Sequence, residues 1–159
     1  MNERKESTTS IILEYVRVIV LTVIATFIFL QFVQISRVNG SSMENTYFQN
    51  NIVLIDKVFY KHSQPKRNDI IIVDYDDGLD DTLIIKRVIA VGGDHLDIKN
   101  NEVYINGKKI KENYIKENMN TEDLSIDIPK GKVFVMGDNR NHSLDSRKLG
   151  YFDFDNDVI

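Results

Sequence analysis

The segment Gly40-Ser41-Ser42-Met43 carries the first side chain that could do chemistry. A serine hydroxyl is a poor nucleophile until a neighbouring base removes its proton. Histidine is the commonest base, but none of His62, His95 and His142 lies in a sequence pattern typical of a Ser-His-Asp triad. Taken alone, the Gly-Ser-Ser segment is more typical of a flexible loop than of an active site.

Lys86 is the second candidate, because it lies inside the apolar run Ile84-Ile85-Lys86-Arg87-Val88-Ile89. Burial penalises the ammonium form, so the pKa of such a lysine falls from about 10.4 toward the ~7–8 that suits a general base. In an extended strand the neighbouring Arg87 points to the opposite face. One cation would then lie inside the protein while the other is available for an ion pair. The alternative is an edge strand on which both cations are solvated.

The segment from Gly137 to Arg147 is the third candidate and follows an apolar strand. It reads Gly-Asp-Asn-Arg-Asn-His-Ser-Leu-Asp-Ser-Arg. Asp and Asn side chains can bond their own backbone in such a turn, and Asp–Arg pairs can hold a loop by bidentate hydrogen bonds. A lysine that acts as a base needs an acceptor that orients its amine without recharging it, and a serine hydroxyl can do this. Ser143 and Ser146 are both candidates, and a polar surface loop is the alternative.

A long apolar run precedes these segments and predicts a membrane-spanning helix over residues 16–35. About 20 residues at roughly 1.5 Å each span the roughly 30 Å hydrocarbon core of a bilayer. A cleaved signal peptide is the alternative, but the run exceeds a usual signal-peptide core and the bulky residues 31–34 offer no cleavage site. A buried soluble helix is disfavoured, because few core helices are apolar on every face. Lys and Arg residues before the run favour a cytoplasmic N-terminus.

Beyond residue 36 the sequence predicts short strands and no amphipathic helix. Apolar runs rich in β-branched residues and bounded by turn residues lie at 52–55, 70–73, 83–85 and 133–136. Apolar residues also alternate on both sides of Asn100-Asn101, which is typical of a hairpin turn, and Asn106-Gly107 marks a further turn. We therefore expect the part after the apolar run to be mostly β.

The composition narrows the possible functions. A chain of 159 residues has room for one anchor and one small domain, and the absence of cysteine excludes disulfides, thiolate metal sites and cysteine nucleophiles. The formal net charge of −4 is spread along the chain without a basic stripe, which argues against nucleic-acid binding. Acidic residues at 74–81 lack the spacing of an EF-hand, and we interpret them as a solvated hairpin tip.

In this order and spacing, the three candidate segments resemble the motifs of the bacterial type I signal peptidases, in the short Gram-positive form with one anchor. The family's Ser-Met-x-Pro-Thr-Leu motif is similar to the segment from Ser42 to Tyr47. Its Lys-Arg-Val-Ile/Val-Gly-Leu-Pro-Gly-Asp motif is similar to the segment from Lys86 to Asp94. Its Gly-Asp-Asn-x-x-x-Ser-x-Asp-Ser-Arg motif is complete from Gly137 to Arg147, and the strand at 68–73 is a fourth, looser match.

The resemblance implies a role for each matching residue. Ser42 would attack the scissile carbonyl, Lys86 would act as its general base, and Ser143 would orient the Lys86 amine. The backbone N–H of Ser42 would donate to the oxyanion; Gly40 stands where many Gram-negative members have a further serine donor. Two ion pairs would hold the loop behind the site, namely Arg87–Asp138 and Asp145–Arg147. The residues expected to bind substrate are Val38, Gly40, Met43, Tyr47, Ile84 and Ile85.

The same resemblance implies the fold, the location and the substrate. We expect residues 1–15 in the cytoplasm, a transmembrane helix at 16–35, and an extracytoplasmic catalytic domain at 36–159. This domain would have the signal-peptidase-like β-barrel or sheet architecture, with a β-ribbon insertion at 94–130. Near the secretion translocon it would bind signal peptides of secreted preproteins as extended strands and cut them after Ala-x-Ala-like sites. No cofactor, metal or nucleic acid is expected. The alternative is an anchored relative that binds signal peptides without cleaving them.

Three positions depart from the family pattern. Asn45 and Gly92 replace prolines, and Tyr47 replaces a leucine. The glycine is expected to loosen the turn after the lysine strand, because proline restricts the chain more than any other residue. The changes at Asn45 and Tyr47 lie close to the nucleophile and to the expected substrate pocket. The chain also stops at Ile159, where family members continue with a further strand.

Overall fold

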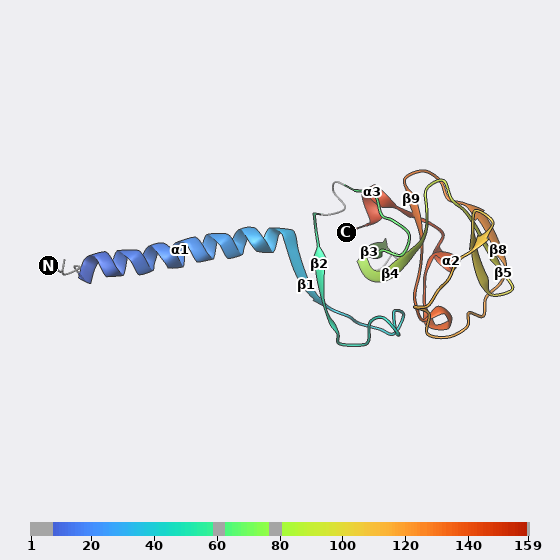
Figure 1. The fold of residues 1–159 in the computed structure, drawn as a ribbon, viewed down its shortest axis with the longest axis horizontal. Helices are drawn as coiled ribbons and strands as arrows, with labels where there is room; N and C mark the ends of the chain where they lie inside the picture. The colour runs from blue at the N-terminus through green and yellow to red at the C-terminus, as the bar shows by residue number, and fades with distance from the viewer. Residues whose placement is uncertain (1–7, 59–62, 77–80, 159) are drawn as a thin grey trace.

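An apolar helix followed by three antiparallel sheets makes up the structure, a computed structural model that describes residues 8–58, 63–76 and 81–158 (Figure 1). Helix α1 (Thr8–Phe32) projects from the β-rich body as a single rod. The mostly β architecture with one N-terminal apolar helix is confirmed. Outside the described residues lie residues 1–7 of the predicted N-terminal segment, residues 77–80 of the predicted hairpin tip, His62 and Ile159.

Helix α1 differs in its bounds from the predicted segment 16–35. It begins at Thr8 and ends at Phe32, and the next residues form strand β1 (Val33–Arg37). Strand β2 (Ile52–Asp56) pairs with β1 in antiparallel register, with Ile35 opposite Leu54. Val33 and Ile35 are apolar and could continue the run of the helix in sequence, but pairing with β2 satisfies the backbone groups of residues 33–35 and determines their conformation.

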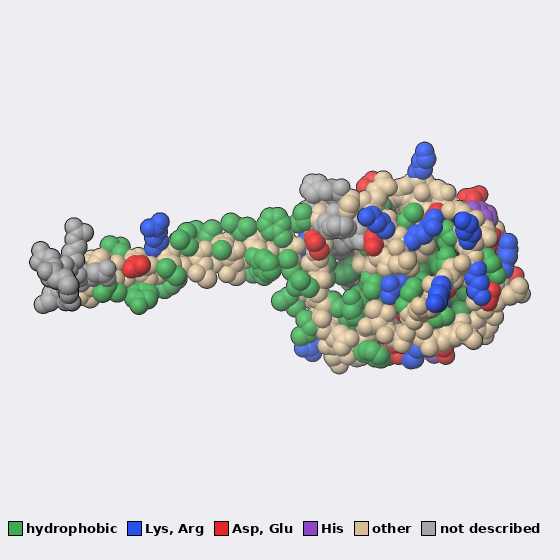
Figure 2. Space-filling view, in the orientation of Figure 1, with side chains coloured by type: hydrophobic (Ala, Val, Ile, Leu, Met, Phe, Trp, Pro, Cys, Tyr) green, Lys and Arg blue, Asp and Glu red, His purple; other side chains and the backbone are tan. Residues whose placement is uncertain are grey.

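No residue of α1 is buried against the rest of the described chain. Its 25 residues span roughly 37 Å at 1.5 Å per residue, and an 18-residue window within it has a mean hydropathy of 2.3. Hydrophobic side chains cover much of the rod (Figure 2). The helix is therefore long and apolar enough to cross a membrane.

The second sheet has the strand order β10-β9-β4-β3. Its strands are β3 (Ile70–Asp76), β4 (Asp81–Val91), β9 (Lys132–Met136) and β10 (Phe152–Asp153). The sheet begins to close on itself, because Val158 forms a β-bridge with Val73 on β3 after the short helices α2 (Ser146–Leu149) and α3 (Phe154–Asp157). The runs predicted at 70–73, 83–85 and 133–136 all lie in this sheet, and the run at 52–55 lies in β2.

The third sheet, of order β7-β6-β5-β8, lies within the segment predicted as an insertion. Its strands are β5 (His95–Lys99), β6 (Glu102–Ile105), β7 (Lys108–Lys109) and β8 (Leu124–Asp127). Asn100 and Asn101 join β5 to β6 with φ of 52° and 63°, which is the conformation that a two-residue hairpin of type I′ requires. Asn106 and Gly107, also at positive φ, join β6 to β7. Both predicted turns are confirmed.

Strand β4 connects two hydrophobic clusters, one on each of its faces. One cluster lies between the second and third sheets and includes Ile89 and Phe134, while the other includes Val88 and Val135. Because neighbouring residues in a strand point to opposite faces, Lys86 lies on the face of Val88, and Arg87 lies on the other. The predicted separation of the two cations is thus observed.

The turn after β4 is held firmly, contrary to the expectation that Gly92 loosens it. Gly93 N–H donates to Ile128 O at 2.8 Å, and Asp94 N–H donates to Val91 O at 3.0 Å. A Cβ atom on Gly92 would lie 2.9 Å from both Pro129 O and Lys130 Cα, so two backbone segments approach each other where no side chain fits. Glycine is required here by close packing.

We therefore expect Gly92→Ala to lower the free energy of unfolding by roughly 1–3 kcal/mol, because the new methyl group must displace backbone atoms. Lys130→Ala removes an exposed side chain at the same contact and should change it by less than about 0.5 kcal/mol. Urea denaturation of both variants measures the difference. Equal stability of Gly92→Ala and the wild type would contradict the close packing.

Candidate active site

Ser42 lies in a compact turn that connects β1 to β2, here called the nucleophile turn and defined as residues 40–47. Hydrogen bonds inside the turn run from Glu44 N to Ser41 O at 3.1 Å and from Tyr47 N to Met43 O at 2.8 Å. Met43 is only 1% exposed, so its side chain anchors the turn in the protein directly after Ser42. The Ser42 side chain itself remains half-buried and accessible.

The Lys86 amine lies against the Ser42 hydroxyl. Lys86 Nζ is 2.9 Å from Ser42 Oγ and also donates to Ile85 O at 2.9 Å. Lys86 is 3% exposed, although it lies in a strand whose next residue is also a cation. The structure therefore brings together the two residues that the sequence proposed as nucleophile and base.

Burial lowers the pKa of Lys86 to about 8. The nearby carboxylate of Asp145 opposes this shift, since a negative charge favours the ammonium form. Burial works to raise the pKa of Asp145 itself, but hydrogen bonds from the Arg147 guanidinium and from Gly137 N–H outweigh it and hold that pKa below its ordinary value. Lys86 thus has a neighbouring carboxylate that stays ionised, yet its burial dominates.

Ser143 does not form the predicted hydrogen bond with Lys86. Its Oγ is buried and has no hydrogen-bond partner among the described residues, although it lies close enough to Asp145 to lower the pKa of that carboxyl. The Ile85 carbonyl occupies a donor of Lys86 instead. The sequence could not predict this contact, because every residue has a backbone carbonyl and no residue type marks the one that accepts. Ser146 Oγ accepts from Val135 N–H at 2.9 Å, so of the two candidate serines Ser143 is the one whose hydroxyl has no partner among the described residues.

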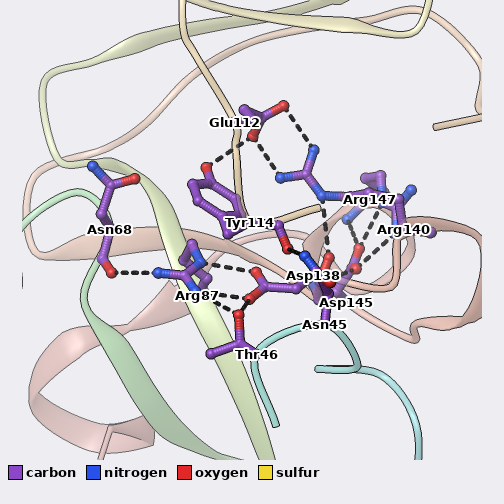
Figure 3. A network of polar contacts seen from close by, with 11 residues as sticks. Asn45, Thr46, Asn68, Arg87, Glu112, Tyr114, Asp138, Arg140, Asp145 and Arg147 are labelled. Carbon is purple, nitrogen blue, oxygen red and sulfur yellow. Dashed lines mark hydrogen bonds and ion pairs between the residues drawn. The ribbon is translucent and has the colours of Figure 1, made fainter. Parts of the chain in front are cut away.

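A buried ion pair lies on the opposite face of β4 (Figure 3). Arg87 donates to both carboxylate oxygens of Asp138, at 2.8 and 2.7 Å, and to Asn68 O at 3.0 Å. Thr46, from the nucleophile turn, donates its hydroxyl to the same Asp138 carboxylate. Burial works to lower the pKa of Arg87, but Asp138 outweighs it and raises that pKa. The predicted pairs Arg87–Asp138 and Asp145–Arg147 are both present.

A segment of the predicted insertion (residues 94–130), namely residues 112–116, also holds the site together, which the sequence did not indicate. The Tyr114 ring lies 4.1 Å from the Arg87 guanidinium, and Tyr114 O accepts from Asn45 Nδ2 at 3.1 Å (Figure 3). Glu112 pairs with the fully buried Arg140 and accepts from the Tyr114 hydroxyl at 2.9 Å. The segment thus contacts all three of the motif regions.

Asn45 adopts a φ of 93° in the nucleophile turn. Proline fixes φ near −65° and could not take this conformation. Asn45 therefore has a positive φ that the proline of the family motif could not adopt, and its side chain is held by a hydrogen bond to Tyr114 O.

A groove extends from Ser42 and Lys86 along β4. Of the residues expected to bind substrate, Val38, Ile84 and Ile85 line it, together with residues of β1, β2 and β3. Gly40, Met43 and Tyr47 are not among its lining residues. Met43 is buried beneath the turn, and Tyr47 lies near Arg87, on the face of β4 opposite to Lys86. Proximity to the nucleophile in sequence therefore does not place a side chain in the groove.

His95 lies in a second set of side chains that could be mistaken for a catalytic triad. Its Nε2 is 3.3 Å from Ser125 Oγ, and its Nδ1 is 2.6 Å from Asp127 Oδ1. The Ser125 hydroxyl, however, donates to Asp97 Oδ1 at 2.8 Å, so its proton is directed away from the imidazole. Ser125 and Asp127 are exposed on the third sheet, and this arrangement lacks the burial that distinguishes Lys86.

Comparison with known proteins agrees with this geometry. The sequence model described as "Signal peptidase, peptidase S26" matches residues 12–158. Signal peptidase I P of Bacillus subtilis subsp. natto is 33% identical, over 96% of this chain and 88% of that protein. Signal peptidase I U of Bacillus subtilis is 37% identical, over 77% of this chain and 69% of that protein.

A solved structure gives the same result for the fold. The crystal structure of a signal peptidase I from Enterococcus faecalis matches with a TM-score of 0.51 and 28% identity, and the match covers 61% of this chain and 97% of that one. Sequence and structure thus agree over most of the chain, and the protein belongs to the peptidase S26 family as a type I signal peptidase, which is a serine protease.

Proposed function

We propose that this protein is a membrane-anchored endopeptidase that removes signal peptides from exported preproteins, with Ser42 as nucleophile and Lys86 as general base. The observation that carries the proposal is the 2.9 Å contact between Lys86 Nζ and Ser42 Oγ, because it joins a poor nucleophile to an amine whose burial lowers its pKa to about 8. The family membership supports the same reaction.

In the proposed reaction, neutral Lys86 accepts the Ser42 proton while Ser42 Oγ attacks the scissile carbonyl. The resulting oxyanion accepts a hydrogen bond from Ser42 N–H. The Lys86 ammonium then protonates the leaving amine, the C–N bond breaks and an acyl-enzyme remains. Water attacks this ester with Lys86 again as base, and the signal peptide leaves as a carboxylate. Ser143 is proposed to orient the Lys86 amine during this cycle, when its unpaired hydroxyl gains a partner.

The signal peptide is proposed to bind as an extended strand along β4. Strand β4 pairs with β3 over residues 81–87, but its pairing with β9 begins only at Arg87. Among the described strands none pairs with the other edge of residues 83–86, so an added strand could bond there, beside Ile84 and Ile85. This edge belongs to the same groove as Val38, Ser42 and Lys86. We propose cleavage after small residues of the Ala-x-Ala kind at this groove.

Helix α1 is proposed to anchor the enzyme in the cell membrane, with the N-terminus in the cytoplasm and residues 36–159 on the outer face, close to the translocon. The length and apolar character of α1 support a span, and β1 follows it without a linker. The short ribbon β1–β2 lies between α1 and the nucleophile turn (Figure 1). A substrate whose own apolar segment lies in the bilayer would therefore meet the site close to the membrane.

Ser42→Ala and Lys86→Met should each lower kcat/KM for a preprotein by more than about a thousandfold, because each removes one member of the pair. Cleavage of a preprotein with an Ala-x-Ala site, measured with purified protein in detergent, tests this. Ser125→Ala is the matched control, since it removes a serine next to a histidine, and it should cleave at the wild-type rate. Cleavage that survives Ser42→Ala would refute the dyad, and a wild type that binds without cutting would favour the binding-only alternative.

The rate should rise with pH, because only the neutral amine can accept the Ser42 proton. Burial lowers the pKa of Lys86 to about 8, so kcat/KM should increase about tenfold from pH 7 to a plateau above pH 9. A pH–rate profile of the wild type measures the midpoint. A midpoint near the ordinary lysine value would mean that Lys86 is solvated, and a rate that falls over this range would exclude Lys86 as the base.

A further inference from the structure

The Ser42 N–H has no hydrogen-bond acceptor among the described residues of the chain, although both backbone carbonyls beside it are bonded. Ser41 O accepts from Asn139 Nδ2 at 3.0 Å, in addition to the bond from Glu44 N–H inside the turn at 3.1 Å, and Ser42 O accepts from Asn139 N–H at 2.9 Å. A single residue of the loop after β9 therefore holds two consecutive peptide units of the nucleophile turn. The Ser42 N–H, which lies between these two carbonyls, is available to a ligand.

These bonds determine the direction in which the Ser42 N–H points. The described chain contains no cis peptide bond, and in a trans peptide the C=O and N–H groups point in opposite directions. The Ser41 carbonyl points at the buried Asn139 side chain, so the Ser42 N–H of the same peptide plane points away from it. A rotation of this peptide would break the bonds that Ser41 O accepts from Asn139 Nδ2 and Glu44 N–H, and it would redirect the Ser42 N–H.

The surroundings of Asn139 keep this contact in place. Asn139 is 1% exposed, and its Oδ1 is buried without a hydrogen-bond partner in the described structure. Burying Asn139 Oδ1 without a partner costs free energy, so any stabilisation from this side chain comes from the hydrogen bond of its Nδ2. Gly137 packs so closely that a Cβ atom there would overlap both Ser42 O and Ser143 Oγ. The loop is therefore pressed against the backbone of the nucleophile itself.

We propose that Asn139 is a positioning residue for the oxyanion donor: through Ser41 O it fixes the peptide plane whose N–H stabilises the transition state at Ser42. This inference rests on the proposed function. Asn139 makes no hydrogen bond to Lys86, whose donors go to Ser42 Oγ and Ile85 O. The proposal thus assigns Asn139 to stabilisation of the oxyanion and not to activation of the nucleophile.

Two variants test the assignment. Asn139→Leu keeps the approximate shape of the side chain, removes the Nδ2 donor and also removes the unpaired Oδ1, and Asn139→Ala removes the whole amide. Loss of an oxyanion donor typically lowers kcat by about 10²–10³. A donor that is misdirected but still present should cost less, about ten- to a hundredfold. KM should remain within about twofold, because the groove along β4 is unchanged.

The matched control is Asn141→Ala. Asn141 lies in the same loop and makes two hydrogen bonds to the insertion, with Asn118 O and Asn120 N, but none to the nucleophile turn. It should lose thermal stability without a comparable loss of kcat. The pH midpoint of kcat/KM, which we expect near the Lys86 pKa of about 8, should be the same in both Asn139 variants as in the wild type, because the environment of Lys86 does not change.

The outcomes separate this inference from the proposed function. A fall in kcat in both Asn139 variants, with KM and the pH midpoint retained, supports the positioning role. Wild-type kcat in Asn139→Leu overturns it while leaving the Ser42–Lys86 pair intact. A shifted pH midpoint also overturns it, because Asn139 would then act through the base. If the wild type itself cleaves no preprotein, the proposed function fails before this test is reached.

Discussion

The buried ion pair between Arg87 and Asp138 is the constraint on which the rest of the site depends. Asp138 is fully buried, and either partner alone would be an uncompensated charge in the interior. The pair therefore forces the loop after β9 to lie against β4. Thr46 donates to the same carboxylate, so the nucleophile turn is drawn to it as well. One carboxylate thereby links the strand of the base, the turn of the nucleophile and the loop that carries Asn139.

The pKa values of the two neighbouring cations shift in opposite directions, because the strand places Lys86 and Arg87 on opposite faces. Arg87 meets a carboxylate and Tyr114 on one face, which raises its pKa. Lys86, on the other face, meets a hydroxyl and a carbonyl, and Asp145 acts on it only through space, so its burial dominates. The strand alternation that places Val88 and Ile89 in different clusters thus also makes one cation structural and leaves the other able to lose a proton.

Local features of the fold could be predicted from the sequence, and contacts through backbone groups could not. The hairpin at Asn100-Asn101 follows from two residues that tolerate positive φ, and the two-faced character of β4 follows from alternation. The end of α1 at Phe32 was not predictable, since residues 33–35 suit a helix or a strand until β2 pairs with them. The hydrogen bonds that Ile85 O and Tyr114 O accept could not be predicted either, because no residue type in the sequence marks a backbone acceptor. For Ser143 the motif indicated proximity to the site, and its hydroxyl has no hydrogen-bond partner within the part of the chain that the structure describes.

Tertiary contacts compensate for the two replaced prolines of the family pattern. A proline stiffens a turn locally, by restricting the unfolded chain. Asn45 instead adopts positive φ, which asparagine tolerates better than most residues, and its side chain is bonded to Tyr114 O in the insertion. At Gly92 the turn is restrained by close packing against residues 129–131, where a proline would restrain it through its own ring. In both places, residues from 94 onward supply what the proline would have supplied. The nucleophile turn that carries Ser42 is therefore held in part by residues 112–116, in the loop between β7 and β8.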